Sequence, residues 1–183
     1  MTLTAYKWTS DRYHQAIDAG LFVDQSLELL RGELIVMPPE REPHAYYNSE
    51  SGDYLRHILA TQAKVREAHP VTLPDHSEPI PDLAIVKPLG IVYRDRHPHP
   101  EDIFWIVEVS NTTLNRDLTV KKDIYAEAGI LEYWVINLRD RELTIFRDLE
   151  NKTYTTVQVA TTGMISPLAF PDLQISIQRL TNP

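Results

Sequence analysis

The pattern of apolar and polar residues first predicts a short helix and a hairpin near the N-terminus. A polar N-cap and, later, Gly20 bound a helix over 11–19. Two apolar runs, 27–30 and 33–37, then flank a tight turn that contains Gly32. Because glycine readily adopts positive φ, these runs predict a β-hairpin.

Two longer stretches carry apolar residues at three- and four-residue intervals, the period of an amphipathic helix. They predict helices over 43–62 and 115–128. Runs rich in β-branched and aromatic residues predict strands, and a polar stretch predicts an exposed loop over 90–102. The predicted strands are 64–73, 83–86, 103–109, 132–136, 143–147, 154–159 and 173–177. This order of elements predicts an α/β or α+β fold with a mixed β-sheet flanked by helices.

Length and composition fit one globular domain. The 183 residues include 43% hydrophobic and 24% charged residues, enough to bury a core without disulfides. We predict a single domain over 1–183, with an N-terminal helix and hairpin (9–37), a core (43–147) and C-terminal strands (153–177). The absence of cysteine excludes disulfides, thiolate metal sites and a cysteine nucleophile, and it fits a cytoplasmic location.

Charge and hydropathy narrow the class of partner. No run approaches the roughly 18 apolar residues of a membrane span, and the charged segment 1–30 argues against a signal peptide. With 18 basic and 26 acidic residues the net charge is −8, which weakens long-range attraction to nucleic acid. A local basic groove with bound Mg²⁺ would still act within a Debye length of about 10 Å, so DNA is not excluded as a substrate.

Two carboxylates stand at the ends of two apolar runs, and a lysine follows on a predicted helix. Asp82 precedes the strand 83–86, Glu108 lies near the end of 103–109, and Lys121 comes 13 residues after Glu108. A carboxylate in an apolar run is costly unless a cation pairs with it. Two carboxylates and an ammonium are the minimal set for metal-assisted phosphodiester cleavage. The acids hold Mg²⁺, and the lysine steadies the attacking water or the developing charge.

Each of these residues also has a structural interpretation. At about 100° per residue, Lys121 falls near the centre of the apolar helix face and Lys122 on its flank. Lys121 therefore either points at Glu108 or extends its alkyl stem along the surface. Asp82, after Pro81, is otherwise a turn or cap residue, and Glu108 is otherwise a solvent-facing residue at the sheet edge.

Four further residues are weaker candidates. His44 lies on the apolar side of the first long helix and Glu28 on the first hairpin strand, so each is either an auxiliary site residue or a satisfied boundary residue. His97 and His99 are interpreted as loop surface, because no third ligand is near them in the sequence. The chain has no G-x-S-x-G, phosphate-binding loop, G-x-G-x-x-G or H-E-x-x-H motif.

From about Tyr13 to Ile177 the chain resembles the Uma2 family, also called DUF820, of restriction-endonuclease-like proteins. The segment that begins at Ile106 is the most specific part of the resemblance. The matching residues are LELLRGEL from Leu27, His44, SEPIPDLA from Ser77, IVEVS from Ile106, Asp117, Lys121, YAEAGI from Tyr125 and EYW from Glu132.

The family is similar to the PD-(D/E)XK nucleases, which share a mixed sheet flanked by helices and a Mg²⁺ site at the split edge of the sheet. The resemblance makes Asp82 the first acid and Glu108 the second, and we expect the Val109 carbonyl to be a third metal ligand. Ser110 occupies the position where these nucleases usually carry a lysine. The family pattern implies that Lys121 takes over that role.

The resulting hypothesis is a DNA endonuclease that depends on Mg²⁺ or Mn²⁺, with His44 and Glu28 as auxiliary groups. Two alternatives stay open: a catalytically weak binding or assembly protein with the nuclease fold, and a hydrolase of a smaller phosphodiester. A basic rim would favour DNA. Nucleases of this superfamily often dimerise to cut both strands, so a homodimer is an expected state. The expected rim residues are Arg94, Arg96, Arg116 and Lys122.

Overall fold

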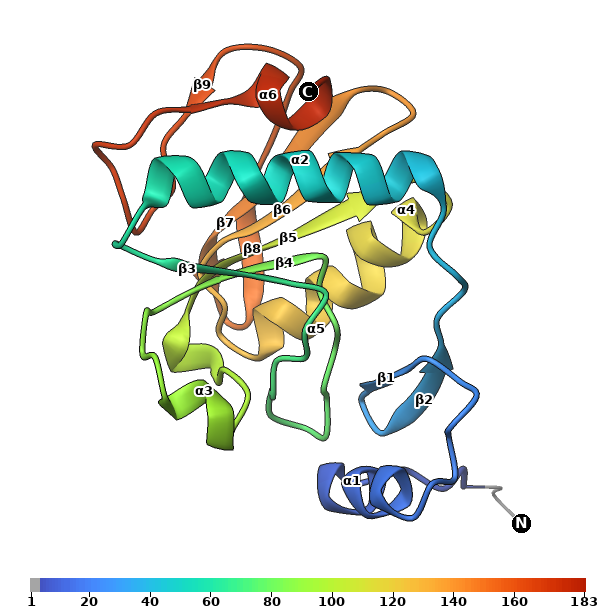
Figure 1. Ribbon diagram of the computed structural model, residues 1–183. Coiled ribbons are helices and arrows are strands. Elements are labelled where there is room, and N and C mark those ends of the chain that lie inside the picture. The colour runs from blue at the N-terminus through green and yellow to red at the C-terminus, as the bar shows by residue number, and fades with distance from the viewer. Residues whose placement is uncertain (1–3) are drawn as a thin grey trace.

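The computed structural model describes residues 4–183, so residues 1–3 of the predicted domain lie outside the described part. A six-stranded mixed sheet with the order β3-β4-β5-β6-β7-β8 forms its centre (Figure 1). β5 and β6 run parallel, and the other neighbouring pairs are antiparallel. The predicted mixed α/β architecture is therefore confirmed. The strands are Lys64–Glu67 (β3), Leu83–Val86 (β4), Ile103–Ser110 (β5), Tyr133–Asn137 (β6), Glu142–Glu150 (β7) and Thr153–Ala160 (β8).

Helices cover both faces of this sheet (Figure 1). One face packs against α2 (Glu42–Leu59), and the other against a helical stretch of three consecutive parts. Successive residues of β5 point to opposite faces, so Trp105 belongs to the α2 core and Ile106 to the other core. This alternation puts Glu108 on the face of the three-part stretch. The three parts of this helical stretch are α4 (Leu114–Arg116), the π-helical turn η2 (Asp117–Lys121) and α5 (Lys122–Glu127).

The N-terminal helix and hairpin form as predicted. They are α1 (Ser10–Asp18), β1 (Leu27–Leu30) and β2 (Glu33–Val36), with Gly32 in the turn. Gly32 has φ +75°, and a Cβ there would lie 2.9 Å from the Trp8 carbonyl oxygen, so the turn requires glycine.

Four predicted segments differ from the observed elements. The strand predicted over 64–73 ends at Glu67, because Ala68 takes φ +50° and leaves the ladder. The predicted loop 90–102 contains two single-turn helices. The predicted strand 173–177 is shortened to residues 175–176, because α6 begins at Ile177. This short strand pairs with β9. The helix predicted over 115–128 contains the π turn. The short elements are α3 (Val92–Asp95), η1 (Pro100–Asp102), β9 (Met164–Ile165), β10 (Ile175–Ser176) and α6 (Ile177–Thr181).

Between residues 4 and 183, none of the helices combines the length and the apolar character that crossing a membrane requires.

Candidate active site

The antiparallel pairing of β4 and β5 brings the two predicted acids to one end of the sheet. Leu83 pairs with Val107, so Asp82, which precedes β4, lies beside the last residues of β5. The main-chain N–H of Val109 donates to Oδ2 of Asp82 at 2.7 Å. Asp82, at the start of β4, and Glu108, near the end of β5, therefore lie at the same end of the sheet.

Glu108 is buried and accepts two hydrogen bonds on a single oxygen. Nζ of Lys121 donates to Oε1 at 2.9 Å, and the hydroxyl of Tyr125 donates to the same atom at 2.7 Å. Nζ of Lys121 also lies 3.2 Å from Oε2 of Glu28, which comes from the hairpin strand β1. Lys121 is 3% exposed, so it bridges two buried carboxylates and does not extend to the surface.

The π turn is held at the end of β5 by a buried polar contact. The Ser110 hydroxyl donates to Oδ2 of Asp117 at 2.7 Å. The Tyr133 hydroxyl donates to the main-chain oxygen of Asp117 at 3.0 Å. Since η2 runs from Asp117 to Lys121, these contacts fix the start of the turn that carries the lysine.

The site holds more carboxylates than cations. Burial is the main cause that raises the pKa of Glu108; Lys121 opposes it, Asp82 and Asp117 add to it, and the net pKa is about 8. Burial alone would lower the pKa of Lys121, but Glu108 and Glu28 outweigh it and raise that pKa. Lys121 therefore stays an ammonium, while the excess negative charge favours uptake of a proton or another cation.

His44 supports Asp82 from the first turn of α2. Its Nε2 lies 3.2 Å from Oδ2 of Asp82, and its Nδ1 lies 2.7 Å from Oε1 of Glu40. Burial alone would lower the pKa of His44, but the two carboxylates raise it to about 9. His44 is therefore an imidazolium at neutral pH and contacts the same Asp82 oxygen as Val109.

Each acid has one oxygen held and one left free. Oδ2 of Asp82 and Oε1 of Glu108 each have two partners, whereas Oδ1 and Oε2 accept no hydrogen bond from residues 4–183. Oε1 of Glu28 and Oδ1 of Asp117 are buried and also lack a hydrogen-bond partner in this range. Free carboxylate oxygens in a site with excess negative charge suit a hard divalent cation such as Mg²⁺.

The main-chain carbonyl of Val109 offers a third oxygen. Because Leu83 pairs with Val107, Pro81 would be the next partner of Val109, but proline has no N–H to donate. The N–H and carbonyl of a strand residue face the same side, so this carbonyl is directed toward the side of Asp82. Within residues 4–183 no three His, Cys, Asp or Glu side chains are arranged around a metal position. A cation here would thus rely on two carboxylates and main-chain oxygen.

The predicted substrate-binding cations are not all brought to this site. Arg116 is nearby, with Nη1 3.7 Å from Oε1 of Glu28, and Lys122 pairs with Asp123 at 3.0 Å. Arg94 lies on α3, which follows the other end of β4, where Val86 pairs with Ile103. Its guanidinium pairs with the neighbouring Asp95 at 2.9 Å. The antiparallel pairing that joins the two acids therefore separates Arg94 from them.

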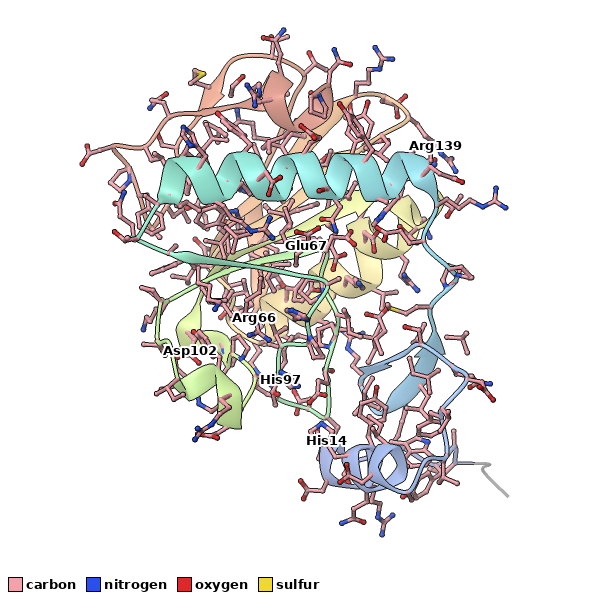
Figure 2. The ribbon with its side chains drawn as sticks, in the orientation of Figure 1. His14, Arg66, Glu67, His97, Asp102 and Arg139 are labelled. Carbon is pink, nitrogen blue, oxygen red and sulfur yellow. The ribbon has the colours of Figure 1, made fainter. Side chains whose placement is uncertain are left out.

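The two histidines interpreted as loop surface differ from one another. His97 is half-buried and lines a cavity of about 380 Å³ with His14 and Glu78; Figure 2 shows His97 on the side of α1 that faces the rest of the molecule. His14 closes part of this cavity through Nε2, which lies 2.9 Å from both Glu78 oxygens. The side chain of His99 is 41% exposed.

The sequence patterns indicated neither Tyr125, which contacts Glu108, nor Arg139, which lies at the same end of the sheet as Glu108. Tyr125 lies four positions after Lys121, a helical spacing that brings both side chains to one face. Arg139 follows β6, and its Nε lies 3.5 Å from Oδ1 of Asn111, three residues beyond Glu108. Parallel pairing of β5 with β6 brings these segments together, and the local sequence carries no signal for it.

Comparisons with known proteins bear on the family and the fold of the chain. A family model, Uma2, described as "Putative restriction endonuclease", matches residues 11–178. The fold is similar to that of the crystal structure described as "a putative nuclease belonging to DUF820" from Anabaena variabilis ATCC 29413. The identity is 18%, the TM-score is 0.68, and the match covers 94% of this chain and 97% of that chain. A comparison with curated proteins gives no match. Because the family model spans most of its length, the chain belongs to the Uma2 family.

Proposed function

We propose that this protein is a DNA endonuclease that uses Mg²⁺ or Mn²⁺ to hydrolyse phosphodiester bonds. The observation that carries the proposal is the arrangement of Asp82 and Glu108. Each acid is held through one oxygen and leaves the other free, beside a buried ammonium. Membership of a family described as restriction endonucleases supports the same reaction class.

In this proposal Asp82, Glu108 and the Val109 carbonyl hold the cation. A bound Mg²⁺ would polarise the phosphate and lower the pKa of a coordinated water. Lys121 keeps a fixed positive charge next to Glu108, where the negative charge of the phosphorane develops or the attacking water is oriented. His44 acts through Asp82, because it holds the oxygen that faces away from the cation.

Glu28 has a different task from the two metal-binding acids. Its Oε2 lies 3.2 Å from Nζ of Lys121, and the Ile80 N–H donates to the same oxygen at 3.4 Å. Glu28 comes from the N-terminal hairpin, so the hairpin contributes directly to the position of the lysine. We therefore assign it the positioning of Lys121.

The surface cations decide between a long and a short substrate. All four cations of the expected rim pair with acidic side chains: Arg94 with Asp95, Arg96 with Asp102, Lys122 with Asp123, and Arg116 with Glu28 and Asp117. This pairing reduces the attraction to a DNA backbone. It favours, as second candidate, hydrolysis of a smaller phosphodiester.

Arg139 is the exposed cation that we propose for contact with DNA. It is exposed, forms no ion pair with residues 4–183, and its only side-chain hydrogen bond in that range is with Asn111. In the view of Figure 2 it lies by the first turn of α2, the turn from which His44 reaches Asp82. Because β5 and β6 run parallel, Arg139 also lies at the same end of the sheet as Glu108, and we infer that it contacts a phosphate near the scissile bond.

Supercoiled plasmid, a short duplex and bis(p-nitrophenyl) phosphate, each incubated with Mg²⁺ or Mn²⁺, test the proposal. We expect the plasmid and the duplex to be cut by wild type and left intact by Asp82→Asn. Turnover of the small diester alone would establish the second candidate. Absence of turnover on all three substrates would contradict both and favour a binding or assembly protein.

A further inference from the structure

Tyr125 is a buried residue to which neither the family description nor the proposed chemistry gives a task. It lies in α5 with no exposed surface, and its ring packs against that of Tyr133 with the centroids 5.0 Å apart. Its hydroxyl makes one hydrogen bond within residues 4–183, the 2.7 Å donation to Oε1 of Glu108. A buried hydroxyl whose single partner is a proposed metal ligand is placed to control that ligand.

We propose that Tyr125 is a positioning residue that makes Glu108 bind its cation through one oxygen, and that it thereby sets the preference of the site for Mg²⁺ over Ca²⁺. This inference rests on the proposed metal site. Tyr125 and Lys121 both donate to Oε1, so this oxygen is occupied from the protein side. Oε2 is the oxygen that remains for the cation.

The number of carboxylate oxygens offered matters because the two cations differ in coordination. Mg²⁺ is small and requires near-octahedral coordination, in which a carboxylate usually supplies one oxygen. Ca²⁺ is larger, takes six to eight oxygens and often binds both oxygens of one carboxylate. For Glu108 to bind through both oxygens, Oε1 would have to leave Tyr125 and Lys121. The tyrosine therefore opposes the geometry that Ca²⁺ accepts more readily.

The variant Tyr125→Phe tests this inference, and Tyr154→Phe is its matched control. Phenylalanine keeps the ring in the core and removes only the hydroxyl. Tyr154 is also buried in the same core and also donates one 2.7 Å hydrogen bond, to the main-chain oxygen of Ile130. The two variants thus lose equivalent hydrogen bonds, but only one of those bonds reaches an acid of the site.

Calorimetric titration of each protein with Mg²⁺ and with Ca²⁺ gives the ratio of the two affinities, and thermal melting checks that each variant is folded. For Tyr125→Phe we expect about tenfold weaker Mg²⁺ binding and a smaller loss for Ca²⁺, so the preference for Mg²⁺ falls. Tyr154→Phe should keep the wild-type ratio.

The contrary outcomes are distinct. If wild type binds and Tyr125→Phe has an unchanged ratio, or if Tyr154→Phe changes the ratio as much, the inference about Tyr125 is wrong and the metal site stands. If wild type binds neither cation, the proposed function is wrong and the inference falls with it.

Discussion

The N–H of Val109 donates to Oδ2 of Asp82 at 2.7 Å, so a side chain takes the place of the next strand residue in the β4–β5 ladder. A continued ladder would also need an N–H from Pro81 for the Val109 carbonyl, and proline has none to donate. The end of the strand pairing therefore opens the sheet where the two acids meet.

Replacing Asp82 by asparagine should abolish Mg²⁺ binding, because it removes the negative charge of one of the two carboxylates. We expect a loss of cleavage of at least about a hundredfold, corresponding to roughly 3 kcal/mol of transition-state stabilisation. Calorimetric titration and plasmid nicking measure both effects. Asp95→Asn, an exposed aspartate paired with Arg94 on α3, is the control and should behave as wild type. Unchanged Mg²⁺ affinity in Asp82→Asn would exclude this metal site.

Lys121→Met should abolish cleavage and also destabilise the fold. Removing the ammonium leaves Glu28 and Glu108 buried without their cation, a change that costs about 3–5 kcal/mol. The carboxylates can take up protons instead, so urea unfolding should show a larger loss at pH 8.5 than at pH 6. Lys122→Ala, whose lysine pairs with Asp123, should stay within about 0.5 kcal/mol of wild type and keep cleavage. Equal effects of the two substitutions would contradict the assignment of Lys121.

His44 should make the stability of the cation-free protein fall as the pH rises. Its pKa rises from 6.5 to about 9 on folding, so its stabilising contribution is complete below pH 6.5 and is lost as the pH rises through 9. Urea unfolding in EDTA at pH 6 and at pH 9.5 should show this loss in wild type, at most about 3 kcal/mol. Glu108 titrates in the same pH range and is present in both wild type and His44→Gln. The difference in pH dependence of stability between the two proteins is therefore the contribution of His44. An equally steep dependence in His44→Gln would show that His44 is not protonated on folding.

The sequence predicted the meeting of the acids, because apolar runs end at Asp82 and near Glu108 and because Lys121 falls on the apolar face of its helix. It could not predict strand direction. Asp82 begins one strand and Glu108 lies near the end of another, so they meet only if the strands are antiparallel. The same pairing sends Arg94, which follows β4, to the opposite end. Arg139 was missed for a related reason: its place depends on the parallel β5–β6 pair.

The π turn was beyond prediction for another reason. A 100° helical projection assumes a regular α-helix, and η2 widens the turn between Asp117 and Lys121. The projection still placed Lys121 correctly, because the buried face of this helix is broad and includes Asp117, Lys121 and Tyr125. Polar contacts such as that of Ser110 with Asp117 fix the turn, and they become visible only when the strand end and the helix start are seen together.

Binding to DNA should depend steeply on salt and should involve Arg139 but not Arg94. A short duplex in Ca²⁺, which supports binding with little turnover, should bind through about four neutralised phosphates, with a log–log salt slope near −3.6 between 50 and 200 mM. Arg139→Ala should weaken binding and make this slope shallower by about 0.9, the value for one lost phosphate contact. Arg94→Ala removes an equally exposed guanidinium at the other end of β4 and should leave both affinity and slope unchanged. A loss confined to Arg94→Ala would place the DNA at that opposite end, away from Asp82. Absence of binding by wild type, even at 50 mM salt, would favour either a smaller phosphodiester as the substrate or a binding or assembly protein.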